Sequence, residues 1–519
     1  MSALPDVLRV RVAELVAVLS YAADLGLGQP MEHCMRQTVI ALRLADLVGA
    51  GERDREGAYY LGLMMNAYCH ADAAEQASWY GDDIAFKHDA FEVLDGGPLG
   101  AVSMLARRLG SHGTGLARAQ RLATVPAGLR RAMAFLTTHA TLAGQFAERI
   151  GLDGAPMRQA YERWDGTGQP GHLCGPQISL PARLVQLASP VEVFHRTRGV
   201  DAARAMAGRY RGARFDPSVV DTFAANAGAV LDGLDAAGDW DALLAVQPGL
   251  AREVSGGELD AVLEAMADLV DLKSPYLAGH SRGVANLAAA AGRVAGLPAA
   301  AVTTLRRAGL LHDLGRLGVS NAVWDKAGPL TTAETERVRL HPYLTDRMLA
   351  RVGALGPSRE IAARHHERLD GSGYPRGLTA ASLTPADRLL AAADAYHALT
   401  EPRPYRPART AEEAARLVRA EVTAGRLDGD ATDAVLRAAG HRAPARRDRP
   451  AGLTAREVQV LGLLARGATN RQIARRLGVT PKTVSNHVEH VYAKLGVSSR
   501  AAATLFATRH NLLGAYEPG

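Results

Sequence analysis

The sequence has few cysteines and no long hydrophobic run. Its 519 residues include only three cysteines (Cys34, Cys69 and Cys174), too few for a disulfide framework, so we expect a reducing, cytoplasmic compartment. No stretch of about 18 residues stays apolar, which argues against a transmembrane helix. Acidic residues at Asp6 and Glu14, with no apolar core before a small-residue cleavage site, argue against a secretion signal.

Strand-like alternation of apolar and polar residues is also scarce. Apolar residues recur at three- and four-residue spacing along most of the chain, which predicts a nearly all-α protein. The length allows three or four domains of about 150 residues each. Two segments interrupt the helical pattern. One, at 246–257, predicts a hinge before a helix that starts near Glu258, and the other, at 441–452, predicts a basic linker rich in proline and arginine.

Charge is unevenly distributed. The chain has a net charge of +6, and the segment from Leu453 to Leu513 alone carries nine Lys or Arg residues against two acidic ones. The remainder is therefore close to neutral. A basic tail on a neutral body favours contact with nucleic-acid phosphates, although a solvated surface has the same composition.

The chain contains an internal repeat. Three correspondences carry it: 161–170 with 366–375, the 32-residue spacing of His33 and Met65 with that of His280 and His312, and His139–Ile150 with His341–Val352. Repeats of this kind indicate duplicated structural units. We therefore predict two copies of one helical domain, here called the first copy (about 1–245) and the second copy (about 256–440).

The second copy holds a set of residues of the types that bind metal ions. Imidazole and carboxylate groups suit iron, manganese, zinc or nickel, and more than four of them exceed one tetrahedral ion. The pair His312–Asp313 follows an apolar helical run, so we expect both on one helix flank. Asp394 lies in the apolar stretch Leu389–Ala395, where a lone carboxylate is costly unless it is paired. The candidate ligands are His280, His312, Asp313, His341, His365, His366 and Asp394.

Residues 256–440 resemble an HD-GYP domain, a branch of the HD phosphohydrolases. The segments that carry the resemblance are 271–276, 279–281, 311–318, 328–331, 341–342, 365–375, 394–399 and 403–406. The resemblance implies an all-α fold, hydrolysis of cyclic di-GMP, and two divalent ions, iron or manganese. It implies that the seven residues above are metal ligands, with Asp313 bridging, and that Asp313 and Arg316 are catalytic. The implied substrate-binding residues are Arg316, Gly373, Tyr374, Pro375, Arg403 and Arg406.

Two positions depart from the family pattern. Arg316 stands where the family usually has lysine, which keeps the charge but changes reach and geometry. Tyr276 stands where some members carry a carboxylate that holds a third ion, so we expect two ions and not three.

The first copy lacks most of these ligands. Aligned with the second copy, it has Met65-Asn66 for His312-Asp313, Cys69 for Arg316, Ala160-Tyr161 for His365-His366, and Ser189 for Asp394. Only His33 and His139 remain. We interpret this copy as a degenerate HD domain that senses, dimerises or braces. Cys34 beside His33 and Cys69 beside His70 would suit redox or metal sensing, and ordinary buried cysteine is the alternative.

The basic tail reads as a small helical domain. Helices are expected at about 454–466, 470–477 and 481–495, the first with a Thr454/Glu457 capping box. On the third helix, valines and a leucine share one face, and the opposite face carries short polar side chains of the kind that base edges need. The candidate DNA-binding residues are Arg471, Lys482, Thr483, Ser485, Asn486, Glu489 and Lys494.

This tail resembles the LuxR-type helix-turn-helix. The resemblance rests on Leu453-Thr454, Arg456-Glu457, Gly467 with Asn470, Ile473-Ala474, Thr483-Val484, His487-Val488 and the run from Lys494 to Val497. It implies a four-helix domain at 453–519 that binds DNA through 453–513, as a homodimer, with the reading helix at about 481–495.

The sequence therefore leads to a first hypothesis with three rivals. The first hypothesis is a transcriptional regulator whose HD-GYP domain binds and hydrolyses a cyclic dinucleotide. The rivals are a metal-dependent phosphodiesterase that the tail only localises, a hydrolase of another nucleotide phosphate, and a catalytically silent sensor that controls the tail. None of the four involves a membrane.

Overall fold

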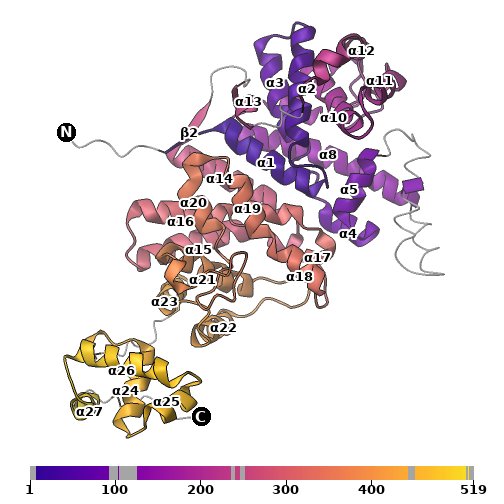
Figure 1. Cartoon of the computed structure of the whole chain (residues 1–519). Coiled ribbons are helices and arrows are strands. Elements are labelled where there is room, and N and C mark those ends of the chain that lie inside the picture. Colours follow the sequence, from indigo (N-terminus) through magenta and orange to yellow (C-terminus); the bar gives the residue numbers. More distant parts are fainter. Residues whose placement is uncertain are drawn as a thin grey trace, which may run out of the picture. The chain divides into compact units, whose positions relative to one another are not determined.

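The structure is a computed structural model that describes residues 8–92, 103–104, 125–234, 240–245, 252–441, 450–509 and 512. It separates into two compact units, Met1–His441 and Arg442–Gly519 (Figure 1). The expectation of a nearly all-α protein is confirmed, because the described ranges contain two short strands and otherwise helices and loops. Within those ranges, no helix combines the length and apolar character needed to cross a bilayer.

Each copy of the repeat begins with a short strand that leads into a helix. Strand β1 (Arg9–Arg11) precedes α1 (Val12–Gly26), and β2 (Glu253–Ser255) precedes α14 (Gly256–Asp271). The two strands pair antiparallel. Strands of three residues are too short to show alternation, so no sequence pattern predicted them. Helix α14 starts two residues before the predicted Glu258, at the glycine that directly follows the strand.

The first copy continues as a set of packed helices, in which α10 packs against α2, α3 and α11. Its elements are α2 (His33–Leu47), α3 (Glu52–Met64), α4 (Ala73–Tyr80), α5 (Asp83–Glu92), α8 (Val125–Arg149), α9 (Ala155–Arg158), η2 (Gly175–Gln177), α10 (Leu180–Arg198), α11 (Val200–Arg209), α12 (Pro217–Leu231) and α13 (Trp240–Ala245).

The second copy repeats this packing, with α15 against both α16 and α21 as α2 lies against α3 and α10. Its elements are η4 (Pro275–Leu277), α15 (His280–Val294), α16 (Ala299–Leu311), η5 (Leu314–Gly318), α17 (Asn321–Trp324), α18 (Thr332–Arg339), α19 (His341–Leu349), η6 (Gly353–Leu355), α20 (Gly356–Ala362), η7 (Ala380–Ser382), α21 (Pro385–Thr400), α22 (Ala411–Thr423) and α23 (Gly429–Ala438).

One loop has the same geometry in both copies. The Glu162 carboxylate accepts hydrogen bonds from backbone N–H groups nine and eleven residues later, at 2.6 and 3.0 Å. Glu367 does the same at 2.8 and 2.8 Å. In this loop a Cβ on Gly168 or Gly373 would overlap the backbone of the preceding turn, so both positions need glycine for packing. The sequence repeat at 161–170 and 366–375 therefore corresponds to a repeated loop geometry.

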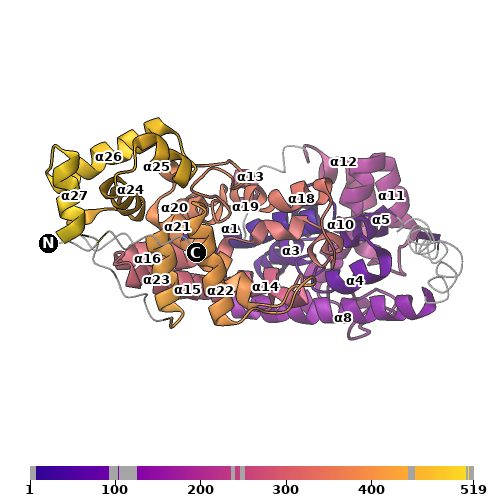
Figure 2. The ribbon, with the colours of Figure 1, turned by 90° about the horizontal axis from the view of Figure 1, so that it is seen from below.

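The two copies share one hydrophobic core. Buried residues of both belong to one continuous cluster, and α1 of the first copy packs against η5 and α19 of the second. Figure 1 and Figure 2 both show α1 between the helices of the two copies. The predicted boundary between 245 and 256 thus lies within one compact unit and stays a prediction.

The C-terminal unit contains the helices expected for the tail. They are α24 (Ala455–Ala465), α25 (Asn470–Leu477), α26 (Pro481–Leu495) and α27 (Arg500–Arg509), after the turn η8 (Pro450–Gly452). The Thr454/Glu457 capping box is present, and Gly478 and Gly496 end α25 and α26 in the left-handed conformation. Most of the predicted linker, at 442–449, lies outside the described residues.

Candidate metal centre and nucleic-acid interface

The candidate ligands come from the ends of several helices and from the interior of α21. His280 is the first residue of α15, His341 is the first of α19, and Asp394 lies within α21. The expectation that His312 and Asp313 share a helix is wrong, because α16 ends at Leu311 and Asp313 begins the turn into η5.

A threonine explains why the helix stops there. The Thr345 hydroxyl donates to the His312 carbonyl at 3.0 Å and accepts from the Gly315 N–H at 2.9 Å. These bonds replace the intrahelical bonds that α16 would otherwise make past Leu311.

Asp313 lies between two sets of imidazoles. Its Oδ2 is 3.5 Å from Nε2 of His280 and 3.2 Å from Nε2 of His312. Its Oδ1 is 3.5 Å from Nε2 of His341 and 3.7 Å from Nε2 of His365. Each carboxylate oxygen therefore faces a different pair of nitrogens, which is the arrangement that a carboxylate shared by two cations needs.

Asp394 and His366 complete the cluster. Asp394 Oδ1 is 3.5 Å from Nε2 of His280 and 3.9 Å from Nε2 of His312, and its Oδ2 is 3.8 Å from Nδ1 of His366. All seven candidate ligands thus meet at one place, and six of them are buried; His366 is partly exposed. Within the described ranges, every group of three or more such donors lies in the second copy.

Hydrogen bonds fix the protonation of three imidazoles. Nδ1 of His312, His341 and His365 each lies 2.6–2.7 Å from the carbonyl oxygen three residues earlier. A carbonyl only accepts, so each Nδ1 carries the proton and each Nε2 presents a lone pair to the cluster. Nε2 of His341 and Nε2 of His365 are 3.1 Å apart, and neither has a proton to share. Two facing lone pairs repel unless a cation lies between them, so these residues fit a metal ion.

The charges of the cluster also suit a cation. Burial lowers the pKa of His341 to about 4 and that of His365 to about 3, so both are neutral ligands at pH 7. Burial alone would raise the pKa of Asp313, but the positive charge of Arg316 holds it well below its usual range. Asp313 Oδ1, and Nε2 of His280 and of His312, are buried without a hydrogen-bond partner. A divalent ion would satisfy all of these atoms.

A carboxylate that was not predicted from the sequence lies behind His280. Nδ1 of His280 donates to Glu401 Oε2 at 2.8 Å, and Glu401 Oε1 is 3.3 Å from Nδ1 of His397. Glu401 directly follows α21, which ends at Thr400, and has an extended backbone, so its place four residues after His397 was the available sequence signal. Glu401 orients His280 as carboxylates orient metal-binding imidazoles.

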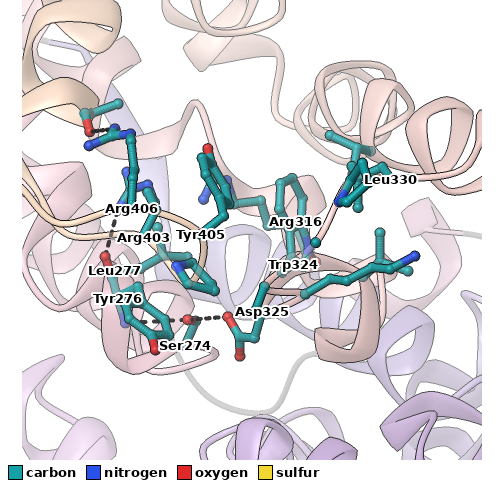
Figure 3. Close-up of a pocket in the computed structure, with 18 of the residues that line it drawn as sticks. Ser274, Tyr276, Leu277, Arg316, Trp324, Asp325, Leu330, Arg403, Tyr405 and Arg406 are labelled. Carbon is teal, nitrogen blue, oxygen red and sulfur yellow. Dashed lines mark hydrogen bonds between the residues drawn. The ribbon is translucent and has the colours of Figure 1, made fainter.

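A cavity of about 540 Å³ opens beside the cluster, with His366 and Asp394 in its wall. Figure 3 shows Arg316 and Trp324 in the same wall. The Arg316 guanidinium lies 4.5 Å from the centre of the Trp324 ring, and its Nε is 2.7 Å from Asp313 Oδ2. Arg316 therefore lines the cavity and also contacts a residue of the ligand cluster. The aromatic Trp324, which the sequence analysis also missed, supports it.

The other predicted substrate-binding residues have different settings. Arg403 and Arg406 line the cavity, but Arg403 bonds to Tyr276 O and Glu401, and Arg406 bonds to backbone carbonyls at the end of α21. Gly373, Tyr374 and Pro375 do not line this cavity; the Tyr374 ring lies 4.7 Å from the His366 ring. Their roles in substrate binding stay predictions.

In the C-terminal unit, the candidate DNA-binding residues fall into two groups, those that are exposed and those that are bonded within the unit. Arg471 of α25 and Lys482, Asn486 and Glu489 of α26 are exposed. The remaining candidates make bonds within the unit: Lys494 Nζ lies 2.7 Å from Glu457 Oε2, the Thr483 hydroxyl lies 2.8 Å from that of Thr480, and Ser485 accepts from Asn470 at 3.1 Å. Lys494 therefore also ties α26 to the start of α24.

Comparison with protein families and known proteins gave matches to both units. The HD domain family matches residues 264–431, and the luxR family of bacterial regulatory proteins matches residues 451–507. The 3'3'-cGAMP-specific phosphodiesterase 3 of Vibrio cholerae is 30% identical over 414 residues, which cover 78% of this chain and 89% of the relative.

Two shorter matches and one solved structure are also similar. The 3'3'-cGAMP-specific phosphodiesterase 1 of V. cholerae is 35% identical over 190 residues, 37% of this chain and 44% of the relative. A cyclic di-GMP phosphodiesterase of Pseudomonas aeruginosa is 40% identical over 157 residues, 29% and 37%. The chain thus spans under half the length of these two. A crystal structure of a cyclic GMP-AMP specific phosphodiesterase from V. cholerae shares the fold, with a TM-score of 0.57 and 24% identity over 84% of this chain and 99% of that one.

Proposed function

Because the chain belongs to the HD-GYP family of phosphodiesterases and carries a LuxR-type domain at residues 451–507, we propose that it is a DNA-binding regulator that hydrolyses a cyclic dinucleotide. The position of Asp313 carries the enzymatic part of the proposal. Its two oxygens face separate sets of imidazole nitrogens, which suits a pair of cations and a phosphodiester substrate.

We assign the ligands to two ions, iron or manganese. His280, His312 and Asp394 form one donor group, His341, His365 and His366 form the other, and Asp313 lies between them. Divalent ions in such a centre supply water of lowered pKa and neutralise charge on phosphate oxygens.

Arg316 is the residue of this chain that would contact the substrate phosphate. Its guanidinium lies on the cavity wall beside Asp313 and Asp394, where a scissile phosphate must lie to reach the ligand cluster. A fixed cation there stabilises negative charge that develops on the phosphate oxygens. The exposed ring of Tyr405 and the partly buried ring of Trp324 line the same cavity and offer aromatic surface for stacking on a base.

The substrate class comes from the relatives. They are named for 3'3'-cGAMP and for cyclic di-GMP, so we propose one of these cyclic dinucleotides for this chain. The cavity volume of about 540 Å³ lies in the range of ligand sites, about 300–1,000 Å³.

The experiment that tests the enzymatic proposal uses the full-length protein. Bound iron and manganese are measured, and hydrolysis of cyclic di-GMP and 3'3'-cGAMP is followed with product identification. We expect turnover by the wild type, at least about a hundredfold loss in Asp313→Ala, and wild-type turnover in the exposed control Asp433→Ala. Metal binding without turnover of either dinucleotide would favour another nucleotide substrate or a silent sensor, and absence of metal would overturn the proposal.

The regulatory part rests on the LuxR-type unit. We propose that α26 enters the major groove and that the protein binds a two-fold site as a homodimer. Genomic footprinting with the full-length protein tests this. Cyclic dinucleotide turnover without any protected DNA would support a phosphodiesterase and contradict the regulatory part of the proposal.

A further inference from the structure

The first copy contains a cavity at the position where the second copy has its ligand cluster. Its volume is about 360 Å³, and its walls are mostly aromatic and aliphatic, among them Phe86, Phe91, Phe135 and Leu136. Cys69, Asp72, His139 and Tyr161 lie in the same wall. A cavity of this size and character suits a small, largely apolar organic molecule.

This cavity is not a divalent metal site. Met65, Asn66 and Ser189 line it at the positions of lost ligands. The remaining His33 is fully buried and engaged elsewhere, with its Nδ1 2.5 Å from Glu192 Oε2. The chemistry of the first copy must therefore come from other groups.

Cys69 takes part in a chain of thiol, imidazole and carboxylate. The Cys69 sulfur is 3.5 Å from the Tyr161 hydroxyl, and His139 lies beside it in the cavity wall. Nε2 of His139 is 3.0 Å from Asp72 Oδ1, and the other Asp72 oxygen accepts from Gln76 at 2.7 Å. The carboxylate thus holds the His139 imidazole in the cavity wall that also contains the thiol, with Nδ1 buried and without a hydrogen-bond partner. Thiol, imidazole and carboxylate are the groups of an activated nucleophile.

The sequence neighbour of Cys69 is not its partner. Nε2 of His70 lies 2.6 Å from the Leu269 carbonyl of α14, so this imidazole is used in the contact between the two copies. The functional pairing is with His139, which is 70 residues away and could not be read from adjacency.

The charges at this site favour the thiolate. Burial raises the pKa of the Cys69 thiol, but the His139 imidazole beside it more than offsets this and brings that pKa below its usual value. Burial lowers the pKa of His139, but Asp72 and Cys69 outweigh it and raise that pKa to about 9. The positively charged His139 imidazole therefore favours the thiolate form of Cys69.

The other two cysteines lack this setting and serve as internal controls. Cys34 is fully buried, and burial together with Asp24 raises the pKa of its thiol well above the usual value. Cys174 is exposed in a loop, with Gln177 at 3.5 Å as its bonded neighbour. Exposure and activation are thus separated among the three thiols.

We propose that Cys69 is a modification site for small, largely apolar electrophiles with an activated carbon–carbon double bond, such as enones and quinones, which enter the first-copy cavity. The Cys69 sulfur forms a bond to the β-carbon, and the π pair moves to the carbonyl oxygen. The resulting enolate takes a proton from His139. The product is a neutral thioether, and no oxidant or reductant is consumed.

The test measures the labelling rate of each cysteine in the full-length protein. N-ethylmaleimide is added at pH 6.5, and peptide mapping by mass spectrometry follows Cys34, Cys69 and Cys174. We expect Cys69 to react at least about tenfold faster than Cys174, and N-phenylmaleimide to favour Cys69 more than a sulfonated maleimide does. Equal rates at Cys69 and Cys174, or no preference for the apolar reagent, would overturn the proposal.

Two variants separate activation from folding. Asp72→Asn removes the carboxylate behind His139 and should slow Cys69 labelling about tenfold, while the exposed control Asp153→Asn should leave it unchanged. An unchanged rate in Asp72→Asn contradicts the proposal. If Asp72→Asn does not fold, the wild-type pH profile decides: a Cys69 rate that levels off below pH 8 supports the thiolate, and a rate that still rises above pH 8.5 overturns it.

Discussion

Asp83 of the first copy and Lys273 of the second form a buried ion pair, with Oδ2 and Nζ 3.6 Å apart. Lys87 lies 3.2 Å from the same oxygen, and Asp83 Oδ1 accepts from the Ser320 hydroxyl at 2.7 Å and the Asn321 N–H at 2.8 Å. Burial opposes the charge on Asp83, but the two lysines outweigh it and lower its pKa to about 2. Asp83 therefore connects α5 to the start of α17. The last residue of α17 is Trp324, whose ring contacts Arg316.

Removal of Asp83 should therefore destabilise the N-terminal unit strongly. Asp83→Asn leaves Lys273 and Lys87 buried without their anion, a situation that costs about 3–5 kcal/mol. Urea unfolding of the full-length protein measures the loss. Asp221→Asn, which breaks an exposed ion pair with Arg211, should cost less than about 1 kcal/mol.

A second variant distinguishes the buried charge from the lost hydrogen bonds. Adding Lys273→Met to Asp83→Asn removes one uncompensated cation and should recover part of the lost stability. A double variant that is no more stable than Asp83→Asn would show that the cost comes from the bonds to Ser320 and Asn321 instead.

The Asp83 contact also marks the limit of what the sequence could predict. Capping residues and apolar spacing fix the helices of the tail, and the ligand set was visible because its residue types are unusual and recur in a family pattern. Asp83 and Asn321 are 238 residues apart, and His280 and Glu401 are 121 apart. No local pattern links such residues, since their contact depends on how the two copies pack.

Local structure also departed from the expected pattern at one ligand pair. The apolar run before His312 predicted that the helix continues through Asp313, but the Thr345 hydroxyl takes the His312 carbonyl and ends it. Thr345 lies 33 residues further along. The tertiary contact therefore overrides the helical pattern where Asp313 must face both imidazole sets.

Glu401 should control metal affinity without being needed as a ligand. Glu401→Gln keeps the shape but loses the carboxylate that accepts from Nδ1 of His280, and loss of such a partner lowers metal affinity about 10- to 100-fold. Titration of the metal-free protein with manganese measures the affinity. Glu336→Gln, on an exposed face of α18, should bind manganese as the wild type does. Wild-type manganese affinity in Glu401→Gln would show that metal binding by His280 does not depend on the Glu401 carboxylate.

Arg316 should act on turnover more than on metal binding. Arg316→Ala removes the cation from the cavity wall, and we expect kcat/KM for the cyclic dinucleotide to fall about 10²- to 10³-fold. Arg316→Lys keeps the charge, as in the usual family pattern, and should retain most of the activity. Metal content measured in parallel should stay at the wild-type level in Arg316→Lys. Equal activity of Arg316→Ala and the wild type would remove the guanidinium from the mechanism.

His70 should make stability depend on pH. Burial lowers its pKa in the folded protein to about 3, whereas the unfolded chain takes up a proton near pH 6.5. The unfolded state thus binds more protons below pH 6.5, so the stability from neutral His70 is complete above that pH and is lost as the pH falls toward 3. Between pH 7 and pH 5 the loss is about 2 kcal/mol.

The measurement compares unfolding free energies at pH 7 and pH 5. His70→Gln can still donate to the Leu269 carbonyl but does not titrate, so it should lose about 2 kcal/mol less than the wild type over this interval. The exposed His490→Gln should behave as the wild type. The same pH dependence in His70→Gln and the wild type would place the titration elsewhere.

Two exposed residues of the C-terminal unit should separate affinity from specificity. Arg471→Ala removes a cation placed for a phosphate, so binding should weaken on all sequences and the slope of log K against log salt should fall by about one. Asn486→Ala removes an amide on the exposed face of α26, so discrimination at one base pair should fall by about 1–3 kcal/mol while the salt slope stays. Titrations of specific and random duplexes at several salt concentrations measure both. Arg437→Ala, which is exposed in the other unit, is the control for lost charge. A specificity change in Arg471→Ala with none in Asn486→Ala would contradict the assignment of phosphate contact to α25 and base contact to α26.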